Sequence, residues 1–327
     1  MIPLRVMLAR CAFAAFLVCA IGHPASAQSC PAKPVKIVSV FPPGGSVDQV
    51  ARILAQQLQT QTGQTFIVEN RGGASGSIGT GVAAKAEPDG TTLAVVFDTH
   101  AVNPSLIPNL PFDTLKDLTP LMLVGTGAMA LVTHPNEPYK SFGDVVAAAK
   151  AKPGSVSYGT IGAGSLGHLV MTQLGNQLGV TFNHVPYRGG GPLMNDAIGD
   201  QVPLAIGSVF LVSPYVSTGR LRAIAVTSEK PDPKLPNVPT IASEGVPGFS
   251  AYTWWGVFGP ANVAPALAKR IYDELDKAVK TPAVREKLSA QGIEVTGAPP
   301  AELDAFVRKE IPRWAKVIKD NNIKSGD

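Results

Sequence analysis

The sequence contains little cysteine, which excludes a disulfide framework. Three cysteines occur among its 327 residues, and Cys11 and Cys19 lie in the apolar start of the chain. If that start is removed after export, Cys30 alone remains, and one cysteine forms no intramolecular disulfide. The chain must then fold around its hydrophobic core. Its length is sufficient for that and favours two domains over one.

The sequence also lacks an apolar run long enough to cross a membrane. The run Cys11–Ile21 is only about half of the ~20 residues that a spanning helix needs. Arg5 and Arg10 precede this run and Ala25-Ser26-Ala27 follows it, which is the layout of a secretory signal. We predict a cleaved signal peptide over residues 1–27 and a periplasmic mature protein. We expect no lipid anchor at Cys30, because no small, uncharged run precedes it.

Basic tracts, frequent aromatic residues and metal-ligand spacings are missing as well. Aromatic residues make up 6% of the chain and the formal net charge is only +4, so nucleic-acid binding is not expected. The histidines after the signal are His100, His134, His168 and His184, and they form no H-E-x-x-H pattern. The sequence therefore predicts no metal site and no cofactor.

What the chain does have is an alternation of short β-branched runs with helical patterns, which is typical of α/β units around parallel sheets. The predicted strands are Val35–Phe41, Phe66–Glu69, Thr92–Phe97, Ala130–Thr133, Val156–Tyr158, Phe182–Val185, Val202–Ile206 and Leu221–Thr227. The predicted helices between them are Val47–Leu58, Ser77–Ala86, Phe142–Ala149, Leu166–Leu178 and Leu193–Ile198. Two similar α/β lobes are the simplest interpretation.

The C-terminal part changes character. Pro265–Lys280, Pro282–Gln291 and Pro300–Asn321 read as helices, each with a proline near its first turn, where the missing N–H does no harm. We expect these helices to fold back over the first lobe. The predicted division is residues 28–128 with 256–327 for lobe 1 and residues 129–255 for lobe 2. The proline-rich stretch Glu229–Pro247 reads as a rigid surface excursion.

Glycine-rich segments stand where strands give way to helices. Four of them stand out: Phe41–Asp48, Asn70–Gly79, Gly159–His168 and Tyr187–Pro192. Such junctions place backbone N–H groups and helix N-termini where an anion can bind. In doubly wound sheets, ligands bind outside the carboxyl ends of the strands, so two facing lobes would bring all four segments to one cleft.

These segments also carry a family resemblance. Val40-Phe-Pro-Pro-Gly-Gly-Ser-Val-Asp48 after a signal peptide resembles the first binding loop of the Bug family, the substrate-binding proteins of tripartite tricarboxylate transporters. Asn70–Gly76, Asn103–Leu106, Tyr158-Gly159 with Gly164-Ser165 and His168-Leu169, Val185–Gly189 and Pro236–Ile241 with Glu244-Gly245 resemble later motifs in the same order. The similarity spans essentially the whole mature chain.

The resemblance implies a two-lobed periplasmic-binding-protein fold of the Venus flytrap kind, type II-like, with the ligand in a cleft between the lobes. It implies as ligand a mono-, di- or tricarboxylate or an acidic amino acid. It also implies a carboxylate anchor at Pro43, Gly44, Gly45 and Ser46. An ordinary helix N-cap is the alternative role for Ser46. Asp48 is expected to have a capping or structural role, unless the ligand carries an amine that it would contact.

The second lobe is expected to close on the ligand with Gly164, Ser165, Tyr187, Arg188 and Gly189. Arg188 is either a bidentate carboxylate clamp or a solvated arginine beside a turn.

Further candidates follow the third strand or lie near the return crossing. Thr99, His100 and Asn103 could reach the cleft, and Trp254 or Trp255 could line it. Buried hinge packing is the alternative for the tryptophans, and His168 reads as a structural histidine.

Three other functions fit parts of the sequence. Gly162–Gly167 matches the dinucleotide pattern G-x-G-x-x-G, but residues 181–187 lack the acidic residue that this pattern requires. The same segment resembles a serine-hydrolase elbow around Ser165, yet only His168 and His184 follow it, too early for the order Ser, acid, His. A secreted serine esterase is therefore a minor alternative. A ligand sensor that docks a membrane receptor is a stronger one.

The sequence thus predicts a non-enzymatic, monomeric solute-binding protein. Its predicted partners are a small organic carboxylate and the membrane permease subunits of a tripartite tricarboxylate-type transporter. The identity of the carboxylate does not follow from the sequence, because main-chain anchoring does not depend on what the carboxylate is attached to.

Overall fold

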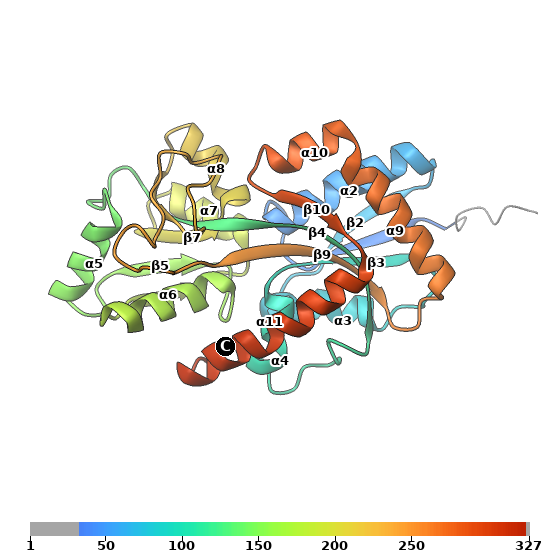
Figure 1. Cartoon of the computed structure of the whole chain (residues 1–327), viewed down its shortest axis with the longest axis horizontal. Coiled ribbons are helices and arrows are strands. Elements are labelled where there is room, and N and C mark those ends of the chain that lie inside the picture. Colours follow the sequence, from blue (N-terminus) through green and yellow to red (C-terminus); the bar gives the residue numbers. More distant parts are fainter. Residues whose placement is uncertain (1–32, 325–327) are drawn as a thin grey trace, which may run out of the picture. The chain divides into compact units, whose positions relative to one another are not determined.

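The computed structural model describes residues 33–324. The predicted signal peptide and Cys30 lie outside these residues. In the described part, ten strands form one continuous sheet with the order β2-β1-β3-β9-β4-β7-β5-β6, to which β10 and β8 add by pairing with β4. Figure 1 shows the two long strands, β4 and β9, running between two groups of helices.

The first half of the sheet is built on three parallel strands. These are β1 (Val35–Ser39), β2 (Phe66–Asn70) and β3 (Thr92–Val96), with β1 in the centre. The connections are α2 (Ser46–Thr62), the 3-10 turn η1 (Ala74–Gly76), α3 (Ser77–Ala84) and α4 (Thr99–Leu106). Helix α2 buries a stripe of apolar residues at helical spacing and ends at Gly63 in the left-handed conformation, as expected for an amphipathic helix with a glycine stop.

Strands β4 (Leu118–Thr133) and β9 (Tyr252–Pro260) join the two halves. Residues 118–128 of β4 pair with β9, while residues 129–133 pair with β7 and β8. Only residues 130–133 were predicted as a strand, and β9 was not predicted. Gly125 and Gly127 interrupt the apolar pattern because the backbone of residues 292–294 lies where their side chains would stand.

The second half carries β5 (Ser157–Thr160), β6 (Asn183–Pro186), β7 (Leu204–Ser208) and β8 (Arg222–Val226). Its helices are α5 (Phe142–Ala151), α6 (Leu166–Leu178), α7 (Gly190–Ile198) and α8 (Val209–Ser217). Ser141 and Asp144 form a capping box at the start of α5, the arrangement that satisfies exposed N–H groups reciprocally.

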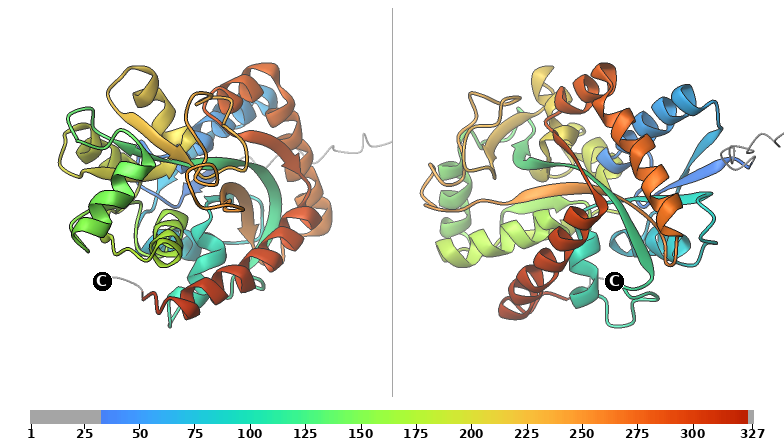
Figure 2. Two further views of the ribbon diagram at one scale, coloured as in Figure 1. Left: turned by 60° about the vertical axis from the view of Figure 1, so that its left-hand side comes forward. Right: turned by 45° about the vertical axis from the view of Figure 1, so that its right-hand side comes forward.

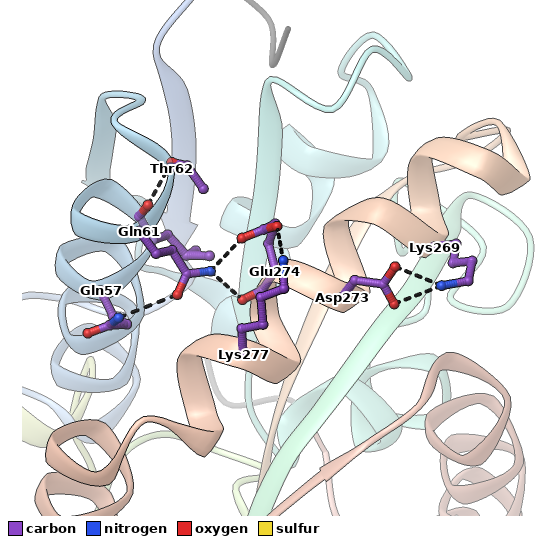
Figure 3. Close-up of polar contacts among 8 residues, drawn as sticks. Gln57, Gln61, Thr62, Lys269, Asp273, Glu274 and Lys277 are labelled. Atoms are coloured by element: carbon purple, nitrogen blue, oxygen red, sulfur yellow. Dashed lines mark hydrogen bonds and ion pairs between the residues drawn. The ribbon is translucent and has the colours of Figure 1, made fainter. Parts of the chain in front are cut away.

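The C-terminal elements are α9 (Pro265–Lys280), α10 (Pro282–Ser289), β10 (Glu294–Ala298) and α11 (Pro300–Asp320). Helix α9 packs against α2, and Gln61 on α2 donates hydrogen bonds to the backbone oxygen and a carboxylate oxygen of Glu274 (Figure 3). Helix α11 packs on α4 and β4 (Figure 2) and also contacts α6. The tail therefore covers the first half, as expected, and reaches the second half through α11.

The proline-rich stretch after β8 is tied to the sheet by backbone hydrogen bonds. Val226 donates to Pro239 O and Ile241 donates to Val226 O, each at 2.9 Å. Thr227 Oγ1 donates to Ala251 O at 2.6 Å and accepts from Met129 N at 2.9 Å. Hydrogen bonds thus hold the proline-rich stretch to the sheet near both of its ends.

Candidate ligand-binding site

Two glycine loops from opposite halves of the sheet meet each other. A Cβ atom on Gly45 would lie 3.6 Å from Gly190 N, and one on Gly44 would lie 3.8 Å from Gly191 Cα. A Cβ atom on Gly191 would lie 2.5 Å from Pro43 O, closer than such atoms can approach. The loop 41–48 and the loop 187–192 therefore make backbone contact, and at Gly191 this contact leaves no room for a side chain.

A small cavity lies where these loops meet, with a free volume of about 10 Å³, room for about one water molecule. We call it the inner cavity. Residues of both halves line it: Phe41, Gly45, Ser46, Val47, Phe97, Met129, Ile161, Gly190, Gly207, Ser208 and Leu211.

Two helices begin at this cavity without a side-chain cap. Within residues 33–324, the N-cap residues Gly45 of α2 and Gly189 of α7 make no side-chain hydrogen bond to their helices. The first N–H groups of a helix lack intrahelical acceptors and carry partial positive charge. Helix α8, which also begins here, is capped by Ser208, whose Oγ accepts from Leu211 N at 3.3 Å.

Asp48 lies in the first turn of α2, but it faces its own loop. Its carboxylate accepts hydrogen bonds from Gly44 N at 3.0 Å and from Asn70 Nδ2 at 2.8 Å, and it pairs with Arg52 at 2.9 Å. Burial raises the pKa of this carboxyl group, but the hydrogen bonds from Arg52, Gly44 and Asn70 outweigh burial and bring the pKa below its ordinary value. The Asp48 carboxylate thus has a structural role: it ties together its own loop, Asn70 and Arg52 and does not cap α2.

A second hollow, the outer groove, adjoins the inner cavity and shares Phe41 and Ile161 with it. It has a volume of about 770 Å³ and is lined by Phe41, Pro42, Pro43, Asn70, Gly72, Gly73, Ala74, Ser75, Ile78, Ile161, Gly162, Ala163, Pro186, Tyr187 and Arg188.

Two polar side chains of the outer groove come from the loop 187–192. Tyr187 donates its hydroxyl to Asp196 Oδ2 at 2.9 Å. Burial, and then Asp196, raise its pKa to about 12. The Arg188 side chain is exposed.

A hydrogen bond crosses between the two halves at this groove. Ser75 Oγ donates to Ala163 O at 2.7 Å, and Asn103 Nδ2 donates to Ser75 O at 3.0 Å. Leu106 of α4 packs directly over Gly164, which has a φ of +71° and no room for a side chain. The loop 162–165 is thus in contact with η1 and α4.

Other predicted site residues are buried in packing and line neither the inner cavity nor the outer groove. Thr99, His100 and Asn103 on α4, Ser165 and Trp254 are each at least 98% buried. His100 packs on Phe258 with ring centroids 4.7 Å apart, and burial lowers its pKa to about 3.

The ring of His168 makes a hydrogen bond and a stacking contact within the second half of the sheet. Its Nδ1 accepts from Gly164 N at 3.0 Å, and its ring stacks on His184 at 3.9 Å. Ser165 Oγ has no hydrogen-bonding partner in the part of the chain that the structure describes, so the structure pairs no histidine with this serine as a hydrolase would need. No group of metal-binding side chains occurs in residues 33–324.

The sequence analysis missed several residues of the inner cavity. Phe97 and Ser208 stand at the carboxyl ends of β3 and β7, where the rule for parallel strands could have found them. Gly190 and Gly207 also line the cavity, together with Met129, Ile161 and Leu211. The signal is weak because the junction between β7 and α8 has no glycine-rich run.

Known proteins are similar to this chain in sequence and in fold. Residues 50–323 match the family described as Tripartite tricarboxylate transporter family receptor, TctC. Protein BugT of Bordetella pertussis is 37% identical over 306 residues, which cover 93% of this chain and 94% of that protein.

Solved structures of related proteins have the same fold as this chain. The periplasmic binding protein BugD has a TM-score of 0.86 and 32% identity, over 90% of this chain and 100% of that chain. An R. palustris protein solved with adipate has a TM-score of 0.86 and 30% identity, over 90% of this chain and 99% of that chain. These structures confirm the two-lobed periplasmic-binding-protein fold.

These relatives are periplasmic binding proteins rather than enzymes. In the described residues, no helix combines the length and the hydrophobicity needed to cross a bilayer. The predicted family is confirmed, and the chain belongs to the Bug family of periplasmic binding proteins, the receptors of the tripartite tricarboxylate transporter family.

Proposed function

We propose that this protein captures a small organic carboxylate between its two lobes, where the loop 41–48 meets the loop 187–192, and delivers it to the permease of a tripartite tricarboxylate-type transporter. The observation that carries this proposal is the convergence of two uncapped helix N-termini, those of α2 and α7, where Gly45 meets Gly190. Such N-termini are sites for anions. The related R. palustris protein was solved with adipate, a carboxylate.

In this proposal the anchor is made by Gly44, Gly45 and Ser46 from one lobe and by Gly189 and Gly190 from the other. Pro43 shapes the first loop, while Tyr187 and Arg188 stand at the outer groove. The proposed lobes are residues 28–128 with 256–327, and residues 129–255; the structure describes residues 33–324 of them. Because both lobes would touch one ligand, capture would favour the closed arrangement, and the permease would distinguish the loaded form from the empty form.

Bulky substitution of Gly44 tests this anchor. Gly44→Val should reduce carboxylate binding by at least about a hundredfold, because the side chain fills the contact with Gly191. Gly219→Val is the matched control: Gly219 has a similar φ, +71° against +83°, and no heavy atom within 4 Å of its Cβ position. Gly219→Val therefore introduces a similar backbone strain at a position outside the site. Unchanged affinity of folded Gly44→Val, measured by calorimetry, would contradict the proposed function.

A further inference from the structure

One carboxyl group is buried where the two halves of the sheet meet. Asp98 follows β3 in the first half and is 1% exposed. Its Oδ2 accepts a hydrogen bond from the hydroxyl group of Thr253 on the crossing strand β9. The backbone N–H groups of Thr99 and of Leu166, the first residue of α6 in the second half, interact with it more weakly. Elements of both halves and the crossing strand therefore enclose this acid.

The surroundings of Asp98 suit a neutral acid better than a charged one. Within residues 33–324 its second oxygen, Oδ1, has no hydrogen-bonding partner. The hydroxyl group of Ser165, the residue before Leu166, is also buried without a partner in this part of the chain. A buried carboxylate is strongly unfavourable when one of its oxygens accepts no hydrogen bond. A protonated carboxyl group avoids this cost because it carries no charge.

The contacts around Asp98 belong to an interface between the two halves. The loop 162–166 of the second half lies against η1 and α4 of the first half. Ser75 Oγ donates to Ala163 O at 2.7 Å, and Leu106 packs over the same loop. Separation of the halves would break these contacts and let water reach the carboxyl group. Asp98 would thus have different environments in a closed and in an open arrangement.

The titratable groups on the surrounding helices do not compensate a charge on Asp98. Glu310 on α11 is itself an acid, disfavours ionisation of Asp98 and pairs with Arg313 at 3.2 Å. Burial lowers the pKa of His100 on α4 to about 3 and that of His168 on α6 to about 4. Both histidines are therefore neutral above about pH 5.

We propose that closure of the two lobes takes up one proton from solvent at Asp98, which makes Asp98 a positioning residue for the closed form and makes closure stronger in acid. The proton binds the carboxylate as the start of α6 docks on it, and it returns to solvent as the lobes part. This proposal rests on the opening and closing that the proposed function requires, but not on the identity of the ligand.

The direction of the pH dependence follows from the two environments. Burial raises the pKa of Asp98 to about 7 in the closed arrangement, whereas an exposed aspartate titrates near about 4. The closed form therefore binds more protons between these pH values. The contribution to closure is complete below about pH 4 and is lost as the pH rises through about 7, by up to about tenfold in the equilibrium constant per pH unit.

Small-angle X-ray scattering of the refolded, ligand-free mature protein tests this proposal, because it reports opening without a ligand. The radius of gyration of the wild type should be larger at pH 8 than at pH 5. Asp98→Asn has nearly the shape of the protonated acid and should remove most of this change. An unchanged radius in the wild type, or the same change in Asp98→Asn, would overturn the proposal and leave carboxylate capture intact. Failure of carboxylates to bind in titration calorimetry would count against the proposed function instead.

Two further variants identify the titrating group. Asp232→Asn is the matched control, because Asp232 is also buried with a raised pKa but accepts its hydrogen bond from Lys234 N, at 2.8 Å, within the second half. It should keep the pH dependence of the wild type. Thr253→Val removes a hydrogen bond that favours the ionised form of Asp98, and it should move the midpoint of the change upward by about one pH unit. A lost pH dependence in Asp232→Asn, or an unmoved midpoint in Thr253→Val, would contradict the assignment to Asp98.

Discussion

Thr253 on the crossing strand β9 donates a hydrogen bond from its hydroxyl group to Asp98 Oδ2, and both residues are almost fully buried. Asp98 follows β3 in the first half of the sheet. The backbone N–H groups of Leu166, at the start of α6 in the second half, and of Thr99 also interact with its carboxyl group. One buried carboxyl group therefore links the first half, the crossing strand and the second half.

This carboxyl group should make stability depend on pH. Burial raises the pKa of Asp98 to about 7, and Glu310 on α11 adds to the rise, against the hydrogen bonds from Thr253, Leu166 and Thr99. Since the folded-state pKa is higher than that of the unfolded chain, the folded protein holds more protons between about pH 4 and pH 7. The contribution of Asp98 to the free energy of unfolding therefore falls as pH rises through this range, by at most about 1.4 kcal/mol per unit.

Asp98→Asn should remove this dependence. Urea unfolding at pH 5 and pH 7.5 should show that the difference in unfolding free energy, wild type minus Asp98→Asn, is smaller at pH 7.5. The difference between the two proteins isolates the effect of Asp98. In both proteins the lowered pKa values of His100, His168 and His184 make the free energy of unfolding rise with pH, and this effect cancels in the difference. A difference that is the same at both pH values would show that Asp98 does not titrate in this range.

The hydrogen bond from Ser75 to Ala163 should stabilise the closed, liganded form. Ser75→Ala should weaken ligand binding by about two- to tenfold, the value of one hydrogen bond. Ser155→Ala is the control, because Ser155 Oγ also donates to a backbone oxygen, that of Lys152, at 2.7 Å, but within one half. Calorimetry that finds the same affinity for both variants would show that the Ser75 bond does not contribute to closure.

The stacked pair His168 and His184 should limit stability in acid. Burial lowers the pKa of His168 to about 4, and burial followed by the charge of His168 lowers that of His184 to about 3. An unfolded histidine titrates near ~6.5, so the unfolded chain binds more protons below that pH. The contribution is complete above about pH 6.5 and is lost as the pH falls towards 4. His168→Gln should lose less unfolding free energy than the wild type between pH 7 and pH 4.5, and an equally steep loss in urea unfolding would contradict this assignment.

Trp254 should matter for folding rather than for ligand contact. It is fully buried and packs edge to face on Phe306 at 5.5 Å. Trp254→Ala should lower the free energy of unfolding by about 3–5 kcal/mol. The milder Trp254→Phe should leave ligand affinity within about twofold. A folded Trp254→Phe protein with strongly weakened binding would place this tryptophan in the site.

Much of the fold could be predicted from periodicity. Helices α6 (Leu166–Leu178) and α9 (Pro265–Lys280) have the predicted bounds, since apolar spacing and proline starts mark them clearly. The crossing strands were harder to predict, because they are buried on both faces and so do not alternate. Helix α8 was missed because it is apolar on all sides and contains Pro214.

The candidate site was predictable where backbone chemistry dominates. The glycine loops at 41–48 and 187–192 were found because strand-to-helix junctions gather at one edge of a sheet. This rule does not predict which side chains of α4 face the cleft and which are buried. The α4 residues Thr99, His100 and Asn103 follow β3 as predicted. Which face of the helix is buried depends on the packing of α11 and on the contacts of His100 with Trp254 and Phe258 of β9.

The most direct test of carboxylate capture compares an acid with its own amide in a thermal-shift experiment on the refolded, ligand-free mature protein. Ligand at a hundredfold excess over the dissociation constant adds about 2.7 kcal/mol to the stability of the native state. The site at Gly45 and Gly190 predicts a rise in the melting temperature with a carboxylic acid that binds and no rise with the matching amide. Equal shifts with acid and amide, or shifts with neither, would contradict an anion site at these helix N-termini.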